Sequence, residues 1–83
     1  MVWSGTKMRT KIVRVVWQDI IQDSSWDSHD KIACPKIESI GWLAFEDDSF
    51  LKIGSTKDEN NQLSAILSIP KGCVLSCKKI SPI

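Results

Sequence analysis

The chain of 83 residues contains no tyrosine, one histidine, three cysteines and no long apolar run. Three cysteines do not make the even, dense disulfide framework of a small secreted protein, so they favour a reducing compartment. No apolar stretch approaches the roughly 20 residues that a membrane-spanning helix needs. The opening residues, MVWSGTK, also lack the apolar segment of a signal peptide. We therefore expect a soluble cytoplasmic protein with no membrane partner.

Residues with catalytic or metal-binding chemistry are equally sparse. His29, beside Asp30, is the only imidazole, and a polar loop position predicts a solvated histidine. Cys73 and Cys77 are four residues apart, which spans roughly 13 Å on a strand, too far for both sulfurs to bind one zinc at about 2.3 Å. Both are expected to face the core. The segment PKG contains a single glycine, too few for a phosphate-binding loop. The sequence predicts no enzyme, no metal and no cofactor.

Charge is nearly balanced but unevenly distributed. Eleven Lys and Arg face ten Asp and Glu, and the net charge of +1 argues against holding long nucleic acid by charge alone. Basic residues gather near both ends of the chain, and aspartates gather in the middle. If the first and last strands are neighbours, their basic residues form one region. The alternative is a solvated strand surface whose charges prevent aggregation.

The sequence does contain a series of β-strand patterns, and no segment keeps a helical period for long. In KIVRVVWQDII, Val13, Val15 and Trp17 share one face. Gly41 permits a bend or a close backbone approach in the second strand. A polar segment, QDSSWDSHDK, has room for one helical turn, and EDDS predicts a tight turn. The expected strands are KIVRVVWQDII, KIESIGWLAFE, FLKIG, LSAILSI and CVLSCKKI.

Five short strands with an abrupt break at PKG predict an all-β fold, a small, five-stranded, partly open barrel of the SH3 or Sm kind. A five-stranded OB barrel is the competing architecture. We expect a single domain over residues 1–83, with residues 1–7 as a flexible N-terminal extension. A chain this short buries only about 60% of its unfolded surface. Because LSAILSI also has no charge to protect a strand edge, we expect a homo-oligomer.

Two resemblances add to this interpretation. The segments IESIGWLAFEDDSFLKI and IPKGCVLSCKKI resemble the Sm-like barrel in their order of strand, acidic turn, break and closing strand, but the family's RNA motifs are absent. The blocks KIVRVVWQDI, IGWLAFEDD and IPKGCV, with a second tryptophan in the polar segment between the first two, are similar to small uncharacterised bacteriophage-encoded β proteins. This second resemblance implies the cytoplasm of an infected bacterium, and Met8 as the usual start.

Four tryptophans are the most informative side chains, because an indole offers a broad face for stacking a nucleobase. Trp42 alternates with apolar neighbours and is expected in the core or in a subunit interface. Trp17 ends its strand and suits either core or site. Trp26 has little apolar company and is the best candidate for a site. Trp3 lies in the expected extension.

These residues define a candidate ligand site. Trp17 or Trp26 would stack a planar base, and Asp19 or Asp27 would accept hydrogen bonds from ribose hydroxyls or an exocyclic amine. The phosphate contacts would come from two basic residues, Arg14 and Lys71. The alternative is structural: Trp26 folds back as a lid over the barrel, and Asp19 caps the turn after its strand.

Two functions remain open at this stage. The first is a phage-encoded binding protein that oligomerises and sequesters a small nucleotide-type signal of bacterial immunity, an anti-defence sponge. The second is an interaction module that binds nucleic acid or a host protein, as Sm-like and SH3-like barrels do. Tryptophan enrichment fits both, and near-neutral charge weighs against nonspecific nucleic acid. The first is preferred, by analogy as much as by physics.

Overall fold

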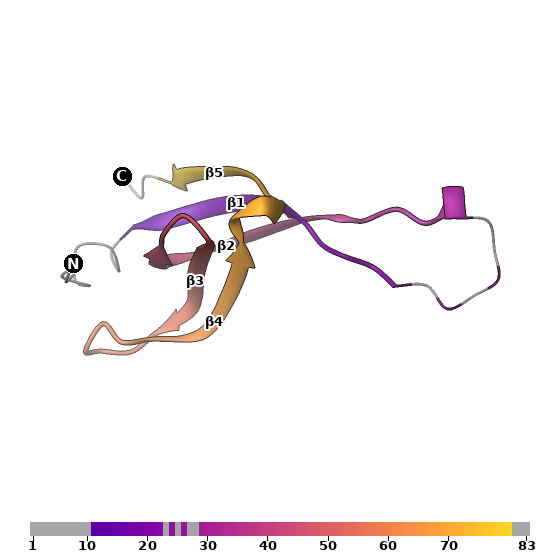
Figure 1. The fold of residues 1–83 in the computed structure, drawn as a ribbon. Helices are drawn as coiled ribbons and strands as arrows, with labels where there is room; N and C mark the ends of the chain where they lie inside the picture. Colours follow the sequence, from indigo (N-terminus) through magenta and orange to yellow (C-terminus); the bar gives the residue numbers. More distant parts are fainter. Residues whose placement is uncertain (1–10, 23, 25, 27–28, 81–83) are drawn as a thin grey trace.

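The computed structural model describes residues 11–22, 24, 26 and 29–80. The expected extension, residues 1–7, lies outside this range. Five strands and two single-turn 3-10 helices make up the described fold (Figure 1). In chain order they are β1 (Ile12–Gln18), η2 (His29–Lys31), β2 (Lys36–Glu46), β3 (Phe50–Lys57), β4 (Leu63–Pro70), η3 (Lys71–Cys73) and β5 (Val74–Ile80).

All five strands belong to one antiparallel sheet in the order β4-β3-β2-β1-β5. Strand β1 lies between β2 and β5, so the first and last strands are neighbours, which was the condition for a shared basic region. The register sets Arg14 opposite Lys78 and Val13 opposite Lys79. Because β4 and β5 remain at opposite edges, the sheet is bent but not closed, which confirms the predicted all-β, partly open barrel.

The inner face of the sheet carries the core, and alternation along each strand determines which side chains reach it. Val13 and Val15 of β1 lie on this face, as the sequence predicts, and Val15 is fully buried. Leu51 and Ile69, which are partners across β3 and β4, are equally inaccessible. The buried cluster consists of Val13, Val15, Leu43, Leu51, Ile53 and Ile69, with Trp17, Leu67, Cys73 and Val74 packed against it.

The outer face carries the intervening residues of the same strands. Ile12 pairs with Trp42, and Arg14 pairs with Ile40, so one basic side chain lies among three apolar ones over β1 and β2. Ile40 is 55% exposed, although it is a large apolar residue in a central strand. No second layer among the described residues covers this face, and its apolar side chains therefore meet solvent.

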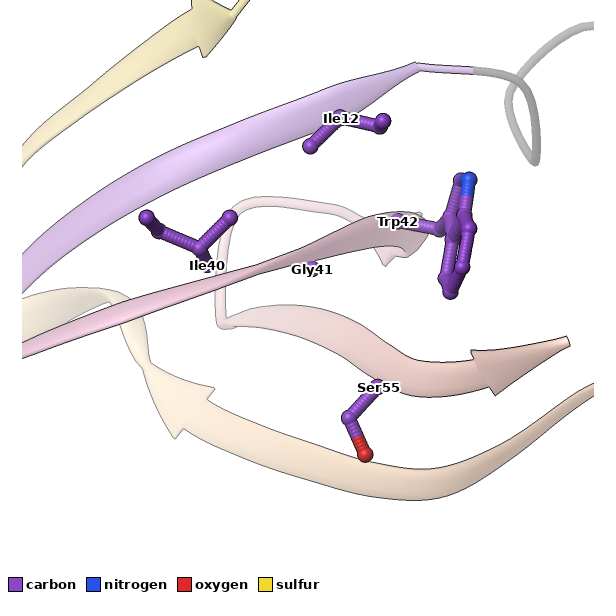
Figure 2. Close-up of a pocket in the computed structure, with 5 residues that line it drawn as sticks. All are labelled: Ile12, Ile40, Gly41, Trp42 and Ser55. Atoms are coloured by element: carbon purple, nitrogen blue, oxygen red, sulfur yellow. The ribbon is translucent and has the colours of Figure 1, made fainter.

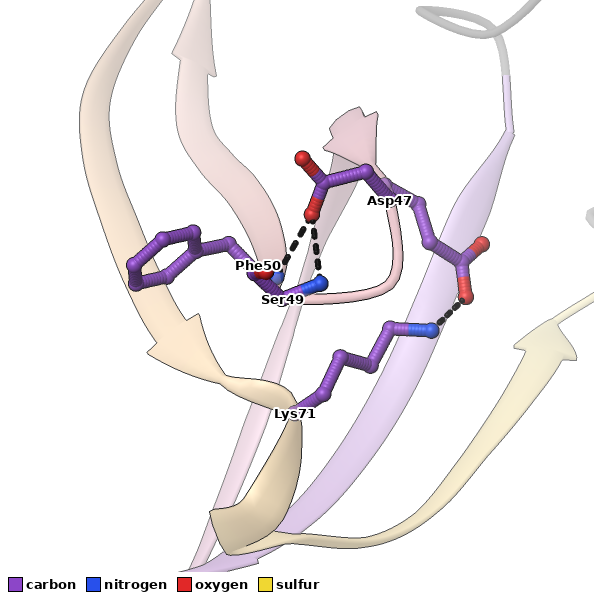
Figure 3. Close-up of polar contacts among 5 residues, drawn as sticks. Asp47, Ser49, Phe50 and Lys71 are labelled. Atoms are coloured by element: carbon purple, nitrogen blue, oxygen red, sulfur yellow. Dashed lines mark hydrogen bonds and ion pairs between the residues drawn. The ribbon is translucent and has the colours of Figure 1, made fainter.

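The turn between β2 and β3 is fixed by Asp47, as the segment EDDS predicts. Its Oδ1 accepts the backbone N–H groups of Phe50 and Ser49 at 2.7 and 2.8 Å (Figure 3). These two donors hold the pKa of the Asp47 carboxyl below its ordinary value, because they favour its charged form. Lys71 reaches the same corner, where its Nζ lies 2.6 Å from Glu46 Oε2.

The connection between β1 and β2, residues 19–35, leaves the sheet as a projecting arm (Figure 1). Its two limbs are joined at the base, where the Asp19 N–H donates to the Pro35 carbonyl at 3.0 Å. Gln18 Nε2 also donates to the Cys34 carbonyl at 3.2 Å. The predicted helical turn of this segment corresponds to η2. None of the arm's described side chains is buried in the core.

Candidate functional site

Trp17, one of the predicted stacking residues, is a core residue. Its ring is half-buried and packs against the inner cluster. Its indole Nε1 donates to Ser39 Oγ at 3.1 Å, so its single N–H already has a partner. Of the two roles that the sequence left open for Trp17, the structure favours the core.

Trp26 lies on the arm, where no described residue covers its side chain. Its side chain is 102% exposed, which contradicts the alternative in which it covers the barrel as a lid. Asp19 Oδ1 accepts the backbone N–H of the adjacent Ile20 at 2.8 Å, a local contact just after the end of β1. Asp27 lies outside the described residues. The arm therefore presents its tryptophan to solvent, and a polar loop with few apolar neighbours gives no physical reason for folding back.

The two predicted phosphate contacts both hold carboxylates. Arg14 is ion-paired with Glu38 on the outer face. Lys71 is paired with Glu46 at the corner beside η3, and this hydrogen bond raises the pKa of the lysine ammonium. The described members of the predicted set thus lie on the inner face, the arm, the outer face and this corner. Within one chain they do not form a single pocket.

A hollow does lie beside the first residue of β1, at the end of this strand away from the arm, and we call it the Trp42 hollow. It has a volume of about 200 Å³ and is lined by Ile12, Ile40, Gly41, Trp42 and Ser55. Figure 2 shows the indole nearly edge-on, with one flat side turned toward Ile12 and Ile40. Residues from three strands meet here, and the register of β1 against β2 sets Ile12 beside Trp42. The site is open and mainly apolar.

Gly41 is the residue that allows this arrangement. A Cβ at this position would lie 2.7 Å from the Gly54 carbonyl oxygen, closer than van der Waals contact permits. The absence of a side chain therefore lets the backbones of β2 and β3 approach each other beside the hollow. The sequence predicted a bend or a close approach at Gly41, and the close approach is confirmed.

A second hollow of about 280 Å³ adjoins the first and shares Ile40 and Ser55 with it. Its other lining residues are Ser39, Ile53, Ala65 and Leu67. Ala65 has a φ of 54°, an unusual conformation for a residue with a side chain, and it lies in the edge strand β4. Two serine hydroxyls, of Ser39 and Ser55, give the neighbouring hollows polar groups beside apolar walls.

Positive charges border the Trp42 hollow. The Lys57 Nζ lies 5.0 Å from the centroid of the Trp42 ring, within the range of a cation–π contact. Arg14 is directly opposite Ile40 in the register, and Lys78 is directly opposite Arg14. Glu38 neutralises the arginine. Among the described residues, Lys57 and Lys78 form no ion pair, and they supply positive charge near this face. The arrangement suits a planar apolar group with an anion beside it.

Sequence reasoning missed this site because Trp42 alternates with apolar residues, which is also the pattern of a core residue. The expectation of a core or interface position is met only in part, since Trp42 is half-buried. The available signal was the run IGW, in which two large apolar side chains flank a glycine on one face of a strand. Only the pairing of β2 with β1 and β3 brings Ile12 and Ser55 to the same place.

The cysteines and the histidine do not converge. Within the described ranges, no group of three His, Cys, Asp or Glu side chains has the proximity to hold a metal ion. Cys73 packs against the core as predicted. Cys77 is in register with the buried Val15 and so lies on the inner side of β5, as expected, but it is exposed, because β5 is an edge strand of the sheet.

In the part of the chain that the structure describes, no helix has the length and apolar character to cross a membrane. No family model, no curated protein and no solved structure matches this chain. Functional inference consequently depends on the chemistry of the described surfaces, and the Trp42 hollow is the most distinctive of them.

Proposed function

We propose that the protein is a non-enzymatic binding protein that sequesters a small nucleotide-type ligand in the Trp42 hollow. The observation that carries this proposal is a half-buried indole facing an apolar hollow at an edge lined by cations. The likeness to bacteriophage proteins supports a signal of bacterial immunity as the ligand, and an anti-defence role in the cytoplasm of the infected host. We retain the homo-oligomer as part of this proposal.

In this proposal the ligand's base lies between Trp42 and the aliphatic side chains of Ile12 and Ile40. Stacking of a base on an aromatic ring contributes about 1–3 kcal/mol to binding. The Ser55 hydroxyl can donate or accept one hydrogen bond at the rim of the hollow. Since the hollow of about 200 Å³ is smaller than the roughly 300–1,000 Å³ of most ligand pockets, it suits a single base.

The anionic part of the ligand would then lie outside the hollow, near the ammonium groups of Lys57 and Lys78. Of the cations predicted to bind phosphate, Arg14 borders this face, but its guanidinium already holds Glu38. Lys71 lies at the opposite corner with Glu46. The proposal therefore moves the site from Trp17 and Trp26 to Trp42, and replaces Lys71 by Lys57 as the principal phosphate contact.

Calorimetric titration with mononucleotides, cyclic nucleotides, cyclic ADP-ribose isomers and short oligonucleotides tests this proposal. A ligand that stacks on Trp42 should bind the Trp42→Leu variant about 5- to 150-fold more weakly, the equivalent of about 1–3 kcal/mol. Trp17→Phe is the matched control, because this inner-face tryptophan does not line the hollow. Equal affinities of wild type and Trp42→Leu would refute the site. So would the failure of all these ligands to bind a variant whose arm cannot cover the hollow, Ile20→Ser with Trp26→Ala.

The second candidate function is an interaction module for nucleic acid or a host protein. A specific observation favours a protein partner: the edge strand β4 contains no charged residue, and its outer edge has no neighbouring strand in the sheet. Such an edge can accept an extended peptide as an additional strand. Recovery of a stoichiometric host protein that is lost on Ser68→Lys, with no nucleotide binding, would support this function.

A further inference from the structure

We propose that the arm of one copy of this chain docks on the Trp42 hollow of a second copy. Ile20 and Trp26 of the arm would then cover Ile40 and Trp42 across the interface. The docking itself depends only on the arm and the hollow. Its consequence for the ligand, that arm and ligand compete for one site, rests on the function proposed above.

The arm has apolar side chains without intramolecular cover. Ile20 is 82% exposed, Ile21 is 51% exposed and Trp26 is fully exposed. Single exposed apolar residues are common on protein surfaces, but a group on one projecting segment marks an interaction site. The base of the arm is nevertheless held to the sheet by hydrogen bonds from Gln18 and Asp19. A segment fixed at its base, with apolar side chains beyond it, can present them to another molecule.

The hollow is the matching surface on the barrel. Ile40 is 55% exposed, and its neighbours Ile12 and Trp42 are only half-buried. Ile66, which is 47% exposed, pairs with Gly54, and Gly54 pairs with Trp42, so the outer-face apolar surface continues across three strands. Burying aliphatic side chains in such a surface stabilises a complex, because it removes apolar area from water.

Charge complementarity identifies a second copy as the occupant. Four aspartates and a single lysine occur among residues 19–35 of the arm, which is therefore acidic. The hollow is bordered by cations instead: Lys57 lies over Trp42, and Lys78 lies opposite Arg14, whose own charge is paired with Glu38. An acidic segment with apolar side chains therefore meets a basic rim around an apolar surface. Opposite potentials of this kind steer association and fix its register.

The arm does not reach the hollow of its own chain in this structure. It leaves the sheet next to Gln18, whereas Ile12 lines the hollow at the other end of β1. Six residues of strand separate these points by roughly 20 Å, and the arm runs in the opposite direction (Figure 1). Since every copy carries both surfaces, two copies can exchange arms in a symmetric, closed contact.

Arm exchange would regulate the proposed ligand site. A base and an arm from another copy cannot occupy the same face of Trp42 at the same time. By linkage, a ligand that displaces the arm weakens self-association, and self-association weakens ligand binding by the same factor. A chain without a docking arm should therefore bind its ligand more tightly than the wild type does.

Analytical ultracentrifugation of two complementary variants tests the docking. The arm variant combines Ile20→Ser with Trp26→Ala and keeps the hollow, and the hollow variant, Ile40→Asp, keeps the arm and adds repulsion against its aspartates. We expect the wild type to self-associate at micromolar concentration, and each variant to show at least a tenfold larger dissociation constant. When the two are mixed, the intact arm of one and the intact hollow of the other should restore a heterodimer.

Leu75→Thr is the matched control, because Leu75 is an exposed apolar strand residue outside the hollow. It should associate as the wild type does, and thermal melts should report that all variants are folded. A monomeric wild type would overturn the docking, and so would unchanged association of the arm variant or a mixture that stays monomeric. The ligand titration is separate: an arm variant that is monomeric but binds no nucleotide would support the docking and refute the proposed function.

Discussion

The barrel and the arm use the same kinds of residue under opposite conditions. In the barrel, Val15 and Leu51 are buried by residues that are distant in sequence. In the arm, Ile20 and Trp26 have no such neighbours and remain exposed. Burial of Val15 in β1 contributes to the stability of the folded chain. The exposed apolar side chains of the arm contribute no such burial energy within one chain. This difference is the basis of our proposal that the arm contacts another copy of the chain.

The largest expected effect lies in the core of the barrel. Leu51→Ala should lower the free energy of unfolding by about 2–5 kcal/mol, because it removes buried methyl groups and leaves a cavity in the inner cluster. Trp26→Ala in the arm is the contrast, and it should change stability by less than about 0.5 kcal/mol at a protein concentration where the chain is monomeric. Denaturant unfolding measures both. Similar losses of unfolding free energy in the two variants would mean that the arm tryptophan supports the fold as the core leucine does.

A smaller effect is expected where two backbones approach each other. Gly41→Ala should destabilise the barrel by about 1–3 kcal/mol, because the added Cβ would lie 2.7 Å from the Gly54 carbonyl oxygen. Gly72→Ala is the matched control, since a Cβ there has no neighbouring atom within 4 Å. Thermal denaturation of the two variants should separate them clearly. Equal melting temperatures would mean that β2 and β3 can move apart at no cost.

The contact between Trp17 and Ser39 predicts a loss of about 0.5–1.5 kcal/mol, the usual net contribution of a hydrogen bond. Trp17→Phe keeps most of the ring but removes the Nε1 donor that lies 3.1 Å from Ser39 Oγ. In the Ser39→Ala background the same change should cost less, because the acceptor is already absent. A double-mutant cycle of unfolding free energies measures this difference, and strictly additive effects would argue against the hydrogen bond.

The turn at Asp47 predicts the smallest effect, and one that depends on pH. Its folded pKa lies below the unfolded value, so the charged carboxylate stabilises the turn above about pH 4. That stabilisation should disappear as the pH falls through the folded pKa. Asp47→Asn should therefore differ most from the wild type near neutral pH and converge with it in acid. Melting temperatures measured at a series of pH values would reveal a constant difference if this assignment is wrong.

Local sequence patterns predicted most of the barrel. The strand KIESIGWLAFE coincides with β2, and the face of β1 that carries Val13 and Val15 is the buried one. The first strand was predicted to run through Ile21, but β1 ends at Gln18, where the side chain of Gln18 and the backbone of Asp19 bond to the base of the arm. Alternation reports which residues share a face, and it does not report where a strand leaves its sheet.

The candidate site was less predictable, for a physical reason. Trp17 and Trp26 are close in sequence, but one enters the core and the other stands on the arm. Ile12, Trp42 and Ser55 are distant in sequence, and strand pairing alone brings them together. A single sequence reports residue types and spacings, whereas the hollow depends on register between strands. The tryptophan that lines a hollow, Trp42, was assigned by its sequence pattern to the core or an interface.

The pairing of the first strand with the last has a consequence for synthesis of the chain. Ile12 of β1 is in register with Ile80 of β5, so this edge of β1 stays unpaired until residue 80 has been synthesised. Pairing of such distant segments is slow, since a long loop must close before any contact forms. During that interval β1 presents an open edge on the nascent chain. Folding yield in the cell should accordingly depend on how quickly the C-terminal strand is delivered, and on chaperones that shield the first strand meanwhile.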